Sequence, residues 1–186
     1  MTEVSSLTGR LLVAAPALTD PNFDRAVVLL LDHDEEGSLG VVLNRPTPVG
    51  VGDILASWAG LTGEPDVVFQ GGPVSLDSAL GVAVIPGGEG PLGWRRVHGA
   101  IGLVDLETPP ELLGPALGSL RIFAGYAGWG PGQLEGELNE GAWYVVESEP
   151  GDVSSPRPER LWRAVLRRQR SELAMIATYP DDPSLN

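Results

Sequence analysis

The chain has 186 residues, of which 42% are hydrophobic and 20% are charged, a composition typical of a globular protein. Its formal net charge of −13 repels phosphate backbones and disfavours non-specific nucleic-acid binding. All the basic residues are arginine and there is no cysteine, which excludes lysine Schiff-base chemistry, P-loop chemistry, thiolate catalysis and disulfides.

Short aliphatic runs bounded by turn residues dominate the first half and predict buried strands. The runs at 26–32 and 39–44 flank the polar segment 33–38, which predicts a hairpin. A helix is predicted over residues 51–61, where apolar residues recur at helical spacing. The other predicted strands are residues 11–15, 67–70, 79–85, 94–97, 101–104, 120–124 and 142–147.

Hydroxyl residues followed by proline mark two helix starts in the second half. Thr108 and Ser155 each precede proline, the pattern of an N-cap before the first helical turn. They predict helices that run to about residue 118 and over 157–170, and a short helix is predicted over 133–139. Strands occur both in a hairpin and between helices, so the predicted fold class is α+β, or mixed α/β. No repeat or composition shift divides the chain, and residues 1–186 are predicted to form a single domain.

No apolar run is long enough to place the chain in a membrane. The longest, residues 26–31, is far too short to span a bilayer. The run at 11–18 is too short for a secretory signal. A cytoplasmic protein without membrane contact is therefore predicted.

The acidic segment at 32–37 matches the first half of a calcium-binding loop. Asp32, Asp34 and Glu36 stand at ligand positions, but Leu43 stands where the loop needs a bidentate carboxylate. No metal site is predicted, and a solvated hairpin tip is the alternative interpretation.

No catalytic motif is present in the sequence. His33 and His98 occur in no metal-ligand spacing, and there is no Gly-x-Ser-x-Gly nucleophile elbow. A Ser–His–Asp site would have to assemble in space. The 25 acidic residues do not single out a catalytic pair, so a metal-independent hydrolase that uses carboxylates stays open as an alternative.

Residues 125–135, GYAGWGPGQLE, form a glycine- and aromatic-rich block between a predicted strand and a predicted helix. A strand, a glycine-rich loop (predicted over 125–132) and a helix in this order present backbone N–H groups to an anion. The block departs from both nucleotide fingerprints, because Gln133 replaces a glycine and Pro131 replaces the P-loop lysine. Two interpretations stay open: a structural turn that Tyr126 and Trp129 anchor to the core, or a ligand site.

The candidate binding residues come from this block and from two turn-forming strings at 44–46 and 71–73. Strand-end loops often share one edge of a sheet, which is why they are grouped. Arg45 could grip a carboxylate or phosphate with two donors, and a structural salt bridge is its alternative use. No cofactor is predicted. The predicted ligand- or partner-binding residues are Asn44, Arg45, Gly71, Gly72, Tyr126, Gly128, Trp129, Gln133 and Glu135.

The predicted helix at 157–170 carries half of the arginines. Arg160, Arg163, Arg167 and Arg170 recur at spacings that place them on one helical face. This face predicts either contact with nucleic acid or an acidic partner, or neutralisation of acids within the same acidic domain.

Several strings, taken in order, resemble the YqgE/AlgH family of bacterial proteins. They span about residues 7–170 and are GRLLVAAP at 9–16, DPNF at 20–23, GVVLNRP at 40–46, GGPV at 71–74, and the block from 125 to 137 with Trp143 after it. The resemblance implies a mixed, partly barrel-like β-sheet surrounded by helices. One branch of the family is described as a transcriptional regulator, and no catalytic residues are established that could be carried over.

The function predicted from the sequence is a non-enzymatic binding or regulatory domain, with transcriptional regulation implied by the family resemblance. It would bind a small ligand or a protein partner at the 125–135 block. The first alternative is nucleic-acid binding through Arg160, Arg163 and Arg167, and the second is the carboxylate hydrolase.

Overall fold

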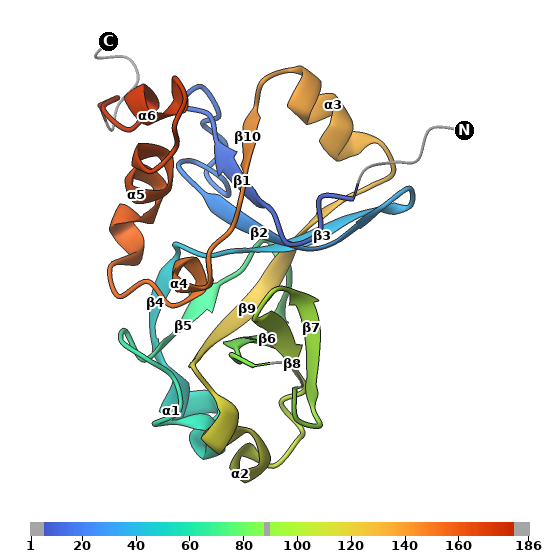
Figure 1. The fold of residues 1–186 in the computed structure, drawn as a ribbon, viewed down its shortest axis with the longest axis vertical. Coiled ribbons are helices and arrows are strands. Elements are labelled where there is room, and N and C mark those ends of the chain that lie inside the picture. The colour runs from blue at the N-terminus through green and yellow to red at the C-terminus, as the bar shows by residue number, and fades with distance from the viewer. Residues whose placement is uncertain (1–5, 88–89, 181–186) are drawn as a thin grey trace.

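The computed structural model describes residues 6–87 and 90–180. Ten strands form a sheet in the order β10-β1-β2-β3-β9-β6-β8-β7, and the β4–β5 pair joins it through β9. The sheet curls strongly into a half-barrel accompanied by a few helices, so the mixed α+β fold class is confirmed (Figure 1).

The strands and helices are mostly short. The strands are β1 (Leu11–Ala14), β2 (Val27–Asp34), β3 (Gly37–Val42), β4 (Pro46–Gly50), β5 (Val67–Gln70), β6 (Val74–Val84), β7 (Trp94–His98), β8 (Ile101–Val104), β9 (Ser119–Trp129) and β10 (Trp143–Val146). The helices are α1 (Val51–Ile54), α2 (Pro110–Leu113), α3 (Gln133–Asn139), α4 (Pro150–Val153), α5 (Leu161–Arg167) and α6 (Leu173–Ile176). Three 3-10 turns are η1 (Ala56–Trp58), η2 (Gly114–Ala116) and η3 (Pro158–Arg160).

Strand β1 is buried on both faces, which explains why its sequence is a continuous aliphatic run. Leu11 and Val13 belong to one core cluster, whereas Leu12 and Ala14 belong to another. Strand β2 contributes alternate residues to the same two clusters. The predicted hairpin is confirmed, because β2 and β3 pair antiparallel. The predicted turn over 33–38 is too long, because β2 continues to Asp34 and β3 begins at Gly37.

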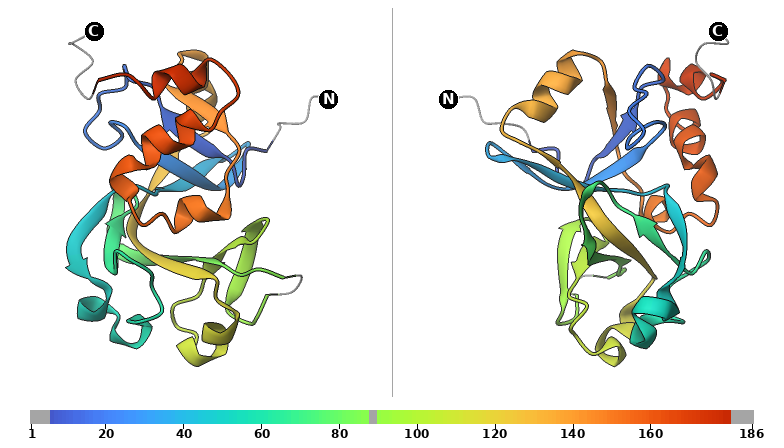
Figure 2. Two further views of the ribbon diagram at one scale, coloured as in Figure 1. Left: turned by 60° about the vertical axis from the view of Figure 1, so that its left-hand side comes forward. Right: turned by 180° about the vertical axis from the view of Figure 1, so that it is seen from behind.

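Strand β9 joins the two halves of the sheet. Its first part pairs with β5 and β6, and its last part pairs with β3. Figure 2 shows β9, in yellow, running between the two halves. The predicted loop over 125–132 is wrong in its first part, because β9 continues to Trp129. Gly125 allows this path with a φ of +73°, a conformation that glycine adopts without strain.

The helix predicted over 51–61 is interrupted after one turn. Helix α1 ends at Ile54, and Leu55 leaves helical geometry with φ −133° and ψ 67°. Trp58 lies in the separate turn η1, where its Nε1 donates to the Leu106 carbonyl over 3.1 Å. The buried indole therefore fixes a 3-10 turn here.

The two predicted proline-started helices are also shorter than expected. The first begins at Pro110, and its N-cap is Pro109 instead of Thr108. The second is α5, which occupies only half of the predicted range 157–170 and follows η3. No helix within the described ranges is long and apolar enough to cross a bilayer.

Arg121 is a buried cation that ties β9 to two distant segments. Its guanidinium donates to the Glu64 and Ser155 carbonyls over 3.2 and 2.9 Å, and it lies 4.3 Å from the Phe69 ring centroid. Burial lowers the pKa of Arg121 to about 10. The arginine therefore stabilises the fold through carbonyl hydrogen bonds and ring contact, at a desolvation cost.

Candidate functional site

The structure separates the predicted binding residues into two groups at opposite ends of β3. At the end of β3, the Val42 N–H donates to the Gly71 carbonyl, beside Arg45 and Gly72. At its start, Leu39 lies opposite Gly128 of β9. The two groups are joined through the backbone, because Gly71 and Gly72 lie against Gly125 and Tyr126 of β9.

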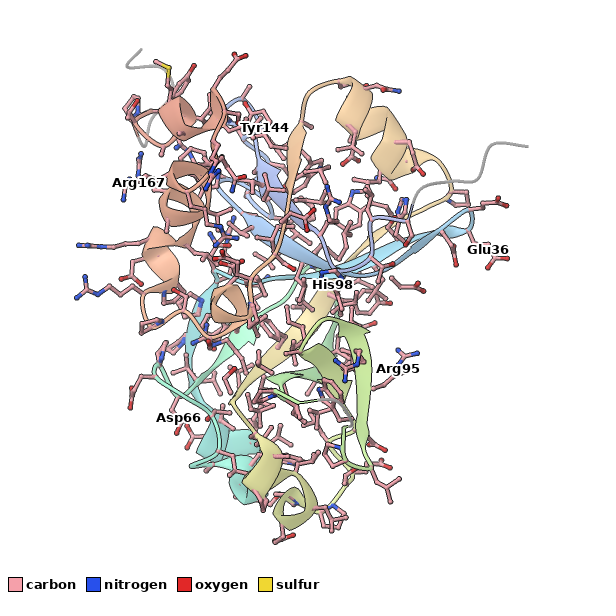
Figure 3. All side chains as sticks on the ribbon, in the orientation of Figure 1. Glu36, Asp66, Arg95, His98, Tyr144 and Arg167 are labelled. Atoms are coloured by element: carbon pink, nitrogen blue, oxygen red, sulfur yellow. The ribbon has the colours of Figure 1, made fainter. Side chains whose placement is uncertain are left out.

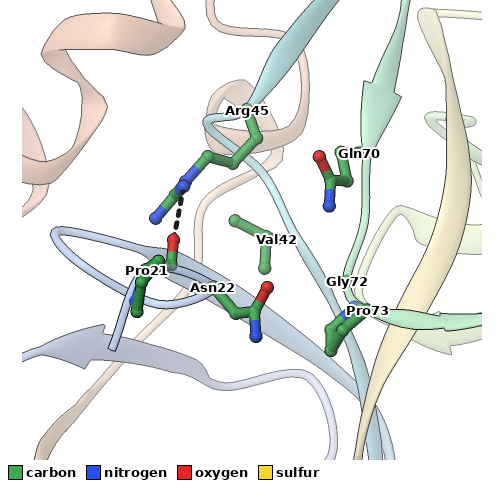
Figure 4. A pocket seen from close by; sticks show the side chains of 7 residues that line it. All are labelled: Pro21, Asn22, Val42, Arg45, Gln70, Gly72 and Pro73. Carbon is green, nitrogen blue, oxygen red and sulfur yellow. Dashed lines mark hydrogen bonds between the residues drawn. The ribbon is translucent and has the colours of Figure 1, made fainter. Parts of the chain in front are cut away.

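Two residues of the first group, Arg45 and Gly72, line a small polar pocket, the Arg45 pocket. Its volume is about 200 Å³. The Arg45 guanidinium is fixed there by the loop between β1 and β2. Its Nη1 donates to the Pro21 carbonyl over 3.1 Å (Figure 4). Its Nη2 donates to the Asp24 carbonyl over 2.7 Å. The lining residues are Pro21, Asn22, Val42, Arg45, Gln70, Gly72 and Pro73.

Within residues 6–87 and 90–180, Arg45 does not form the salt bridge considered as its alternative use. Both of its described partners are backbone carbonyls, which orient the guanidinium without neutralising its charge. A guanidinium has five N–H donors, so these two bonds leave donors available. Arg45 is therefore a positioned cation beside an open pocket.

Two amide side chains line the same pocket. The side chains of Asn22 and Gln70 are exposed and form no hydrogen bond within residues 6–87 and 90–180. Each offers both a donor and an acceptor. Neither residue was among the predicted binding residues. Asn22 stands in the DPNF string at 20–23, which indicated the family but not a binding role, and Gln70 ends a predicted strand.

Asn44 has a structural role beside the pocket. Its Oδ1 accepts from the Val27 N–H over 3.0 Å, and its Nδ2 donates to the Arg25 carbonyl over 2.8 Å. These bonds join the end of β3 to the start of β2 and occupy the amide.

Gly71 and Gly72 bring the chain against the backbone of β9. A Cβ on Gly71 would lie 2.4 Å from the Gly125 carbonyl oxygen, and one on Gly72 would lie 2.1 Å from the carbonyl carbon of Tyr126. Both positions need glycine for close backbone approach, and Gly72 also forms a wall of the Arg45 pocket. Tyr126 is half-buried and contacts this turn through its backbone.

Trp129 and Gln133 in the second group are paired within the protein. Trp129 Nε1 and Trp143 Nε1 both donate to Glu137 Oε1, over 3.0 and 2.9 Å. Gln133 Nε2 donates to Glu137 Oε2 over 3.1 Å, and Gln133 Oε1 accepts from the Gly130 N–H over 3.0 Å. This arrangement favours the structural interpretation of these two residues.

Glu135 lies near a buried pair, His33 and Ser38, that no motif in the sequence brings together. His33 Nδ1 lies 2.6 Å from Ser38 Oγ, and His33 Nε2 lies 3.8 Å from Glu135 Oε2. His33 and Ser38 are only 4% and 9% exposed. They face each other across the β2–β3 hairpin. The hairpin was predicted, but its register and the approach of α3 have no signal in the sequence.

A surface pocket of about 240 Å³ opens beside Ser38. Leu39 pairs with Asp32 and lies on the same face of the hairpin as the acidic side chains. Ser38 pairs with His33, so its side chain lies on the opposite face. Figure 3 shows Glu36 at the outer end of the hairpin. The lining residues are Asp32, Asp34, Glu36, Gly37, Ser38, Leu39 and Trp129.

The predicted arginine face is divided by the observed structure. Arg160 ends η3, while Arg163 and Arg167 lie on α5, and Arg170 follows that helix. Arg163 Nη1 donates to the carbonyls of Ala177 and Tyr179 over 2.6 and 2.7 Å. Arg160 and Arg167 are exposed, and Figure 3 shows Arg167 at the outer side of α5. The four arginines therefore do not form one helical face.

Alanine substitution is expected to distinguish an arginine that stabilises the fold from one that only contributes surface charge. R163A should lower the free energy of unfolding by about 1–3 kcal/mol, because it leaves two carbonyls without their donor. The R167A control should stay within about 0.5 kcal/mol of the wild type. Urea unfolding measures both changes, and an equal loss in both variants would contradict this assignment of roles.

Comparison with known proteins identifies the family. Residues 11–174 match the family model described as AlgH-like. A UPF0301 protein of Streptomyces coelicolor is 86% identical over 190 residues, covering 100% of this chain and 98% of its own. A crystal structure of a Corynebacterium diphtheriae protein superposes with a TM-score of 0.89 at 32% identity, covering 96% of this chain and 95% of its own.

A second solved structure carries the family name. The solution structure of the AlgH protein from Pseudomonas aeruginosa has a TM-score of 0.69 and 27% identity, over 97% of this chain and 98% of that one. The resemblance found in the sequence motifs is thus confirmed by a matching family model, a close relative and two folds. This chain belongs to the AlgH-like, UPF0301 family.

Proposed function

We propose that this protein is a binding domain for a small anionic ligand, a carboxylate or a phosphate monoester, at the Arg45 pocket. The observation that carries the proposal is the guanidinium of Arg45, held at the pocket by two carbonyls and paired with no carboxylate among its described contacts. A fixed cation with unused donors is a recognition element for planar or tetrahedral oxyanions.

The rest of the pocket suits a polar ligand. The Asn22 and Gln70 amides can donate to an anion or accept from its hydroxyl groups. Pro21 and Pro73 restrict the backbone at the rim, which lowers the entropic cost of holding the pocket open. The volume of about 200 Å³ admits a small head group and excludes most of a nucleotide.

The electrostatics favour recognition at short range. The net charge of −13 repels an approaching anion, so long-range steering does not assist binding. Attraction must come from direct contact with Arg45, and weak affinity for a minimal anion, about 1 mM in Kd, is expected. The regulatory and transcriptional roles implied by the family resemblance would require a further partner that responds to the occupied pocket.

The test is a titration with inorganic phosphate and with acetate, followed by backbone amide chemical shifts. Shifts are expected in the segments 21–24 and 70–73, and R45A should weaken binding at least about tenfold. R95A is the matched control, since Arg95 is an exposed arginine on β7 and no residue of β7 lines the Arg45 pocket. Unchanged binding by R45A, or an equal loss in R95A, would overturn the proposal.

A further inference from the structure

Arg168 is an arginine that neutralises acids of its own domain. Its Nη1 and Nη2 donate to Asp152 Oδ1 and Oδ2 over 2.6 and 2.8 Å, and its Nη1 also lies 3.0 Å from Glu149 Oε2. Asp152 is buried, so this pair lies largely out of water. Neutralisation, one of the two uses predicted for the arginines at 157–170, is therefore the role of Arg168.

Three other arginines of this segment do not have that role. Arg157, Arg160 and Arg167 are exposed, and within residues 6–87 and 90–180 none of their guanidiniums pairs with a carboxylate or donates a hydrogen bond. Residues 157–170 contain six arginines and one acidic residue, Glu159. Charges more than about 8 Å apart are largely screened at physiological ionic strength. A partner in contact with this segment therefore meets a positive surface, although the net charge of the chain is −13.

These three residues, named the arginine row, follow one another along η3 and α5. Arg157 and Arg160 are one 3-10 turn apart, since the Arg160 N–H donates to the Arg157 carbonyl over 3.0 Å, and their Cα atoms are within about 7 Å. Arg160 has right-handed helical dihedral angles and continues into α5. Arg167 therefore lies two helical turns further, about 10 Å along the axis and on the same side as Arg160. Ala164, which is exposed, lies between them.

The side of α5 away from the arginine row is fixed in the core. Figure 2 shows α5, in orange-red, on the outside of the molecule. The helix is thus held from behind, and its arginines are presented outward from a supported backbone. The buried residues of α5 are Leu161, Trp162, Val165 and Leu166.

The arginine row fits an extended acidic polypeptide. The row spans roughly 16 Å. An extended chain rises about 3.3 Å per residue and points alternate side chains to one face, so carboxylates at every second position stand about 6.6 Å apart and cover the row within about seven residues. Guanidiniums bind carboxylates through two parallel hydrogen bonds. Each exposed ion pair strengthens binding only about two- to fivefold, so several pairs must act together.

A nucleic acid fits this surface less well. Three cations are a small electrostatic footprint for a phosphate backbone, and the net charge of −13 opposes the approach of a long polyanion. The indole of α5, Trp162, is only 3% exposed and is not available to stack on bases.

We propose that the arginine row is a docking surface for an extended acidic segment of a partner protein, with carboxylates at alternate positions bound by Arg157, Arg160 and Arg167. This surface shares no residue with the Arg45 pocket and does not depend on the anion site proposed there.

The first experiment titrates the ¹⁵N-labelled full chain with the capped peptide Glu-Ser-Glu-Ser-Glu-Ser-Glu and follows backbone amide chemical shifts. Shifts are expected in the segment 157–168, distinct from the segments 21–24 and 70–73 expected for phosphate. R167A should weaken binding about three- to fivefold, and R160A with R167A about tenfold or more. R95A, which removes an exposed arginine on β7, is the matched control and should bind like the wild type. A folded wild type without shifts at 157–168, or an equal loss in R95A and R167A, would overturn the proposal.

The second experiment keeps the wild-type chain and varies the partner. A peptide with glutamine at each glutamate position should not bind, and raising the salt from about 50 to about 500 mM should weaken binding of the acidic peptide at least about fivefold. A peptide of the same composition with its four glutamates adjacent should bind at least about threefold more weakly, because its carboxylates are too closely spaced for the row. Equal or tighter binding of that peptide would overturn the extended arrangement. Tighter binding of a short DNA duplex or of phosphatidylserine vesicles, lost in R160A with R167A, would overturn the protein partner.

Discussion

E137A is expected to lower the free energy of unfolding by about 3 kcal/mol, because one carboxylate oxygen serves two indoles. Trp129 and Trp143 are 5% and 4% exposed, and both donate Nε1–H to Glu137 Oε1. Their rings also pack edge to face, with centroids 6.1 Å apart. Alanine leaves two N–H groups without an acceptor at a site that water reaches poorly, and each such group costs about 1–3 kcal/mol.

The matched variant E137Q retains an oxygen at the same position. It should lose only about 1 kcal/mol, because the amide oxygen still accepts from both indoles while the amide nitrogen faces Gln133. Glu140→Ala, a change of an exposed acid after α3, should have an effect within about 0.5 kcal/mol. Urea unfolding followed by tryptophan fluorescence compares the three variants. If E137A unfolded at the wild-type midpoint, the shared acceptor would not stabilise the block.

The buried strands of the first half, β1, β2 and β5, could be predicted because burial on both faces leaves a simple signal. In β1, neighbouring residues belong to different core clusters, so every position is apolar. Strand β5 was predicted with its observed limits, Val67–Gln70, for a related reason: Val68 and Phe69 are buried in different clusters. Where core packing requires an apolar residue at every position, the local sequence is sufficient to predict a strand.

The end of β9 and the whole of β4 could not be predicted, because pairing with distant strands overrides the local composition. Gly125 and Gly128 indicate a turn by composition, yet the segment is held as a strand by its pairing with β3. Strand β4 contains Pro46 and Pro48, which argue against a strand, and it persists as the partner of β5.

The candidate sites show the same division. Arg45 and Gly72 were singled out by their turn motifs and do meet in one pocket. Asn22 and Gln70 reach that pocket from separate segments, and neither local sequence indicates which other segment it approaches. The approach of Glu135 to His33 joins residues about 100 positions apart, and it depends on how α3 packs against the hairpin. The sequence shows which residues carry charge or hydrogen-bonding groups, but it does not show which of them lie close together in the fold.

G72A is expected to be the most damaging single-methyl substitution considered, with a loss of about 3 kcal/mol or more. The added Cβ would lie 2.1 and 2.2 Å from the carbonyl carbon and oxygen of Tyr126 and 2.4 Å from the Ala127 nitrogen. These are backbone atoms, and the pairing of β9 with β3 and β6 restrains them. A flexible side chain could move aside, whereas this segment can move only if strand pairing is disturbed.

G63A is the control for the added methyl group. A Cβ on Gly63 would meet no atom within 4 Å, so its effect should stay within about 0.5 kcal/mol. The melting temperature of G72A should fall by about 6–12 °C, given about 2–4 °C per kcal/mol for a chain of this size. Phosphate binding should weaken as well, because Gly72 is a wall of the Arg45 pocket and its displacement moves the lining. If G72A and G63A had the same melting temperature, β9 would have to move at Tyr126 without loss of stability. The close approach of Gly72 to β9 would then not stabilise the fold.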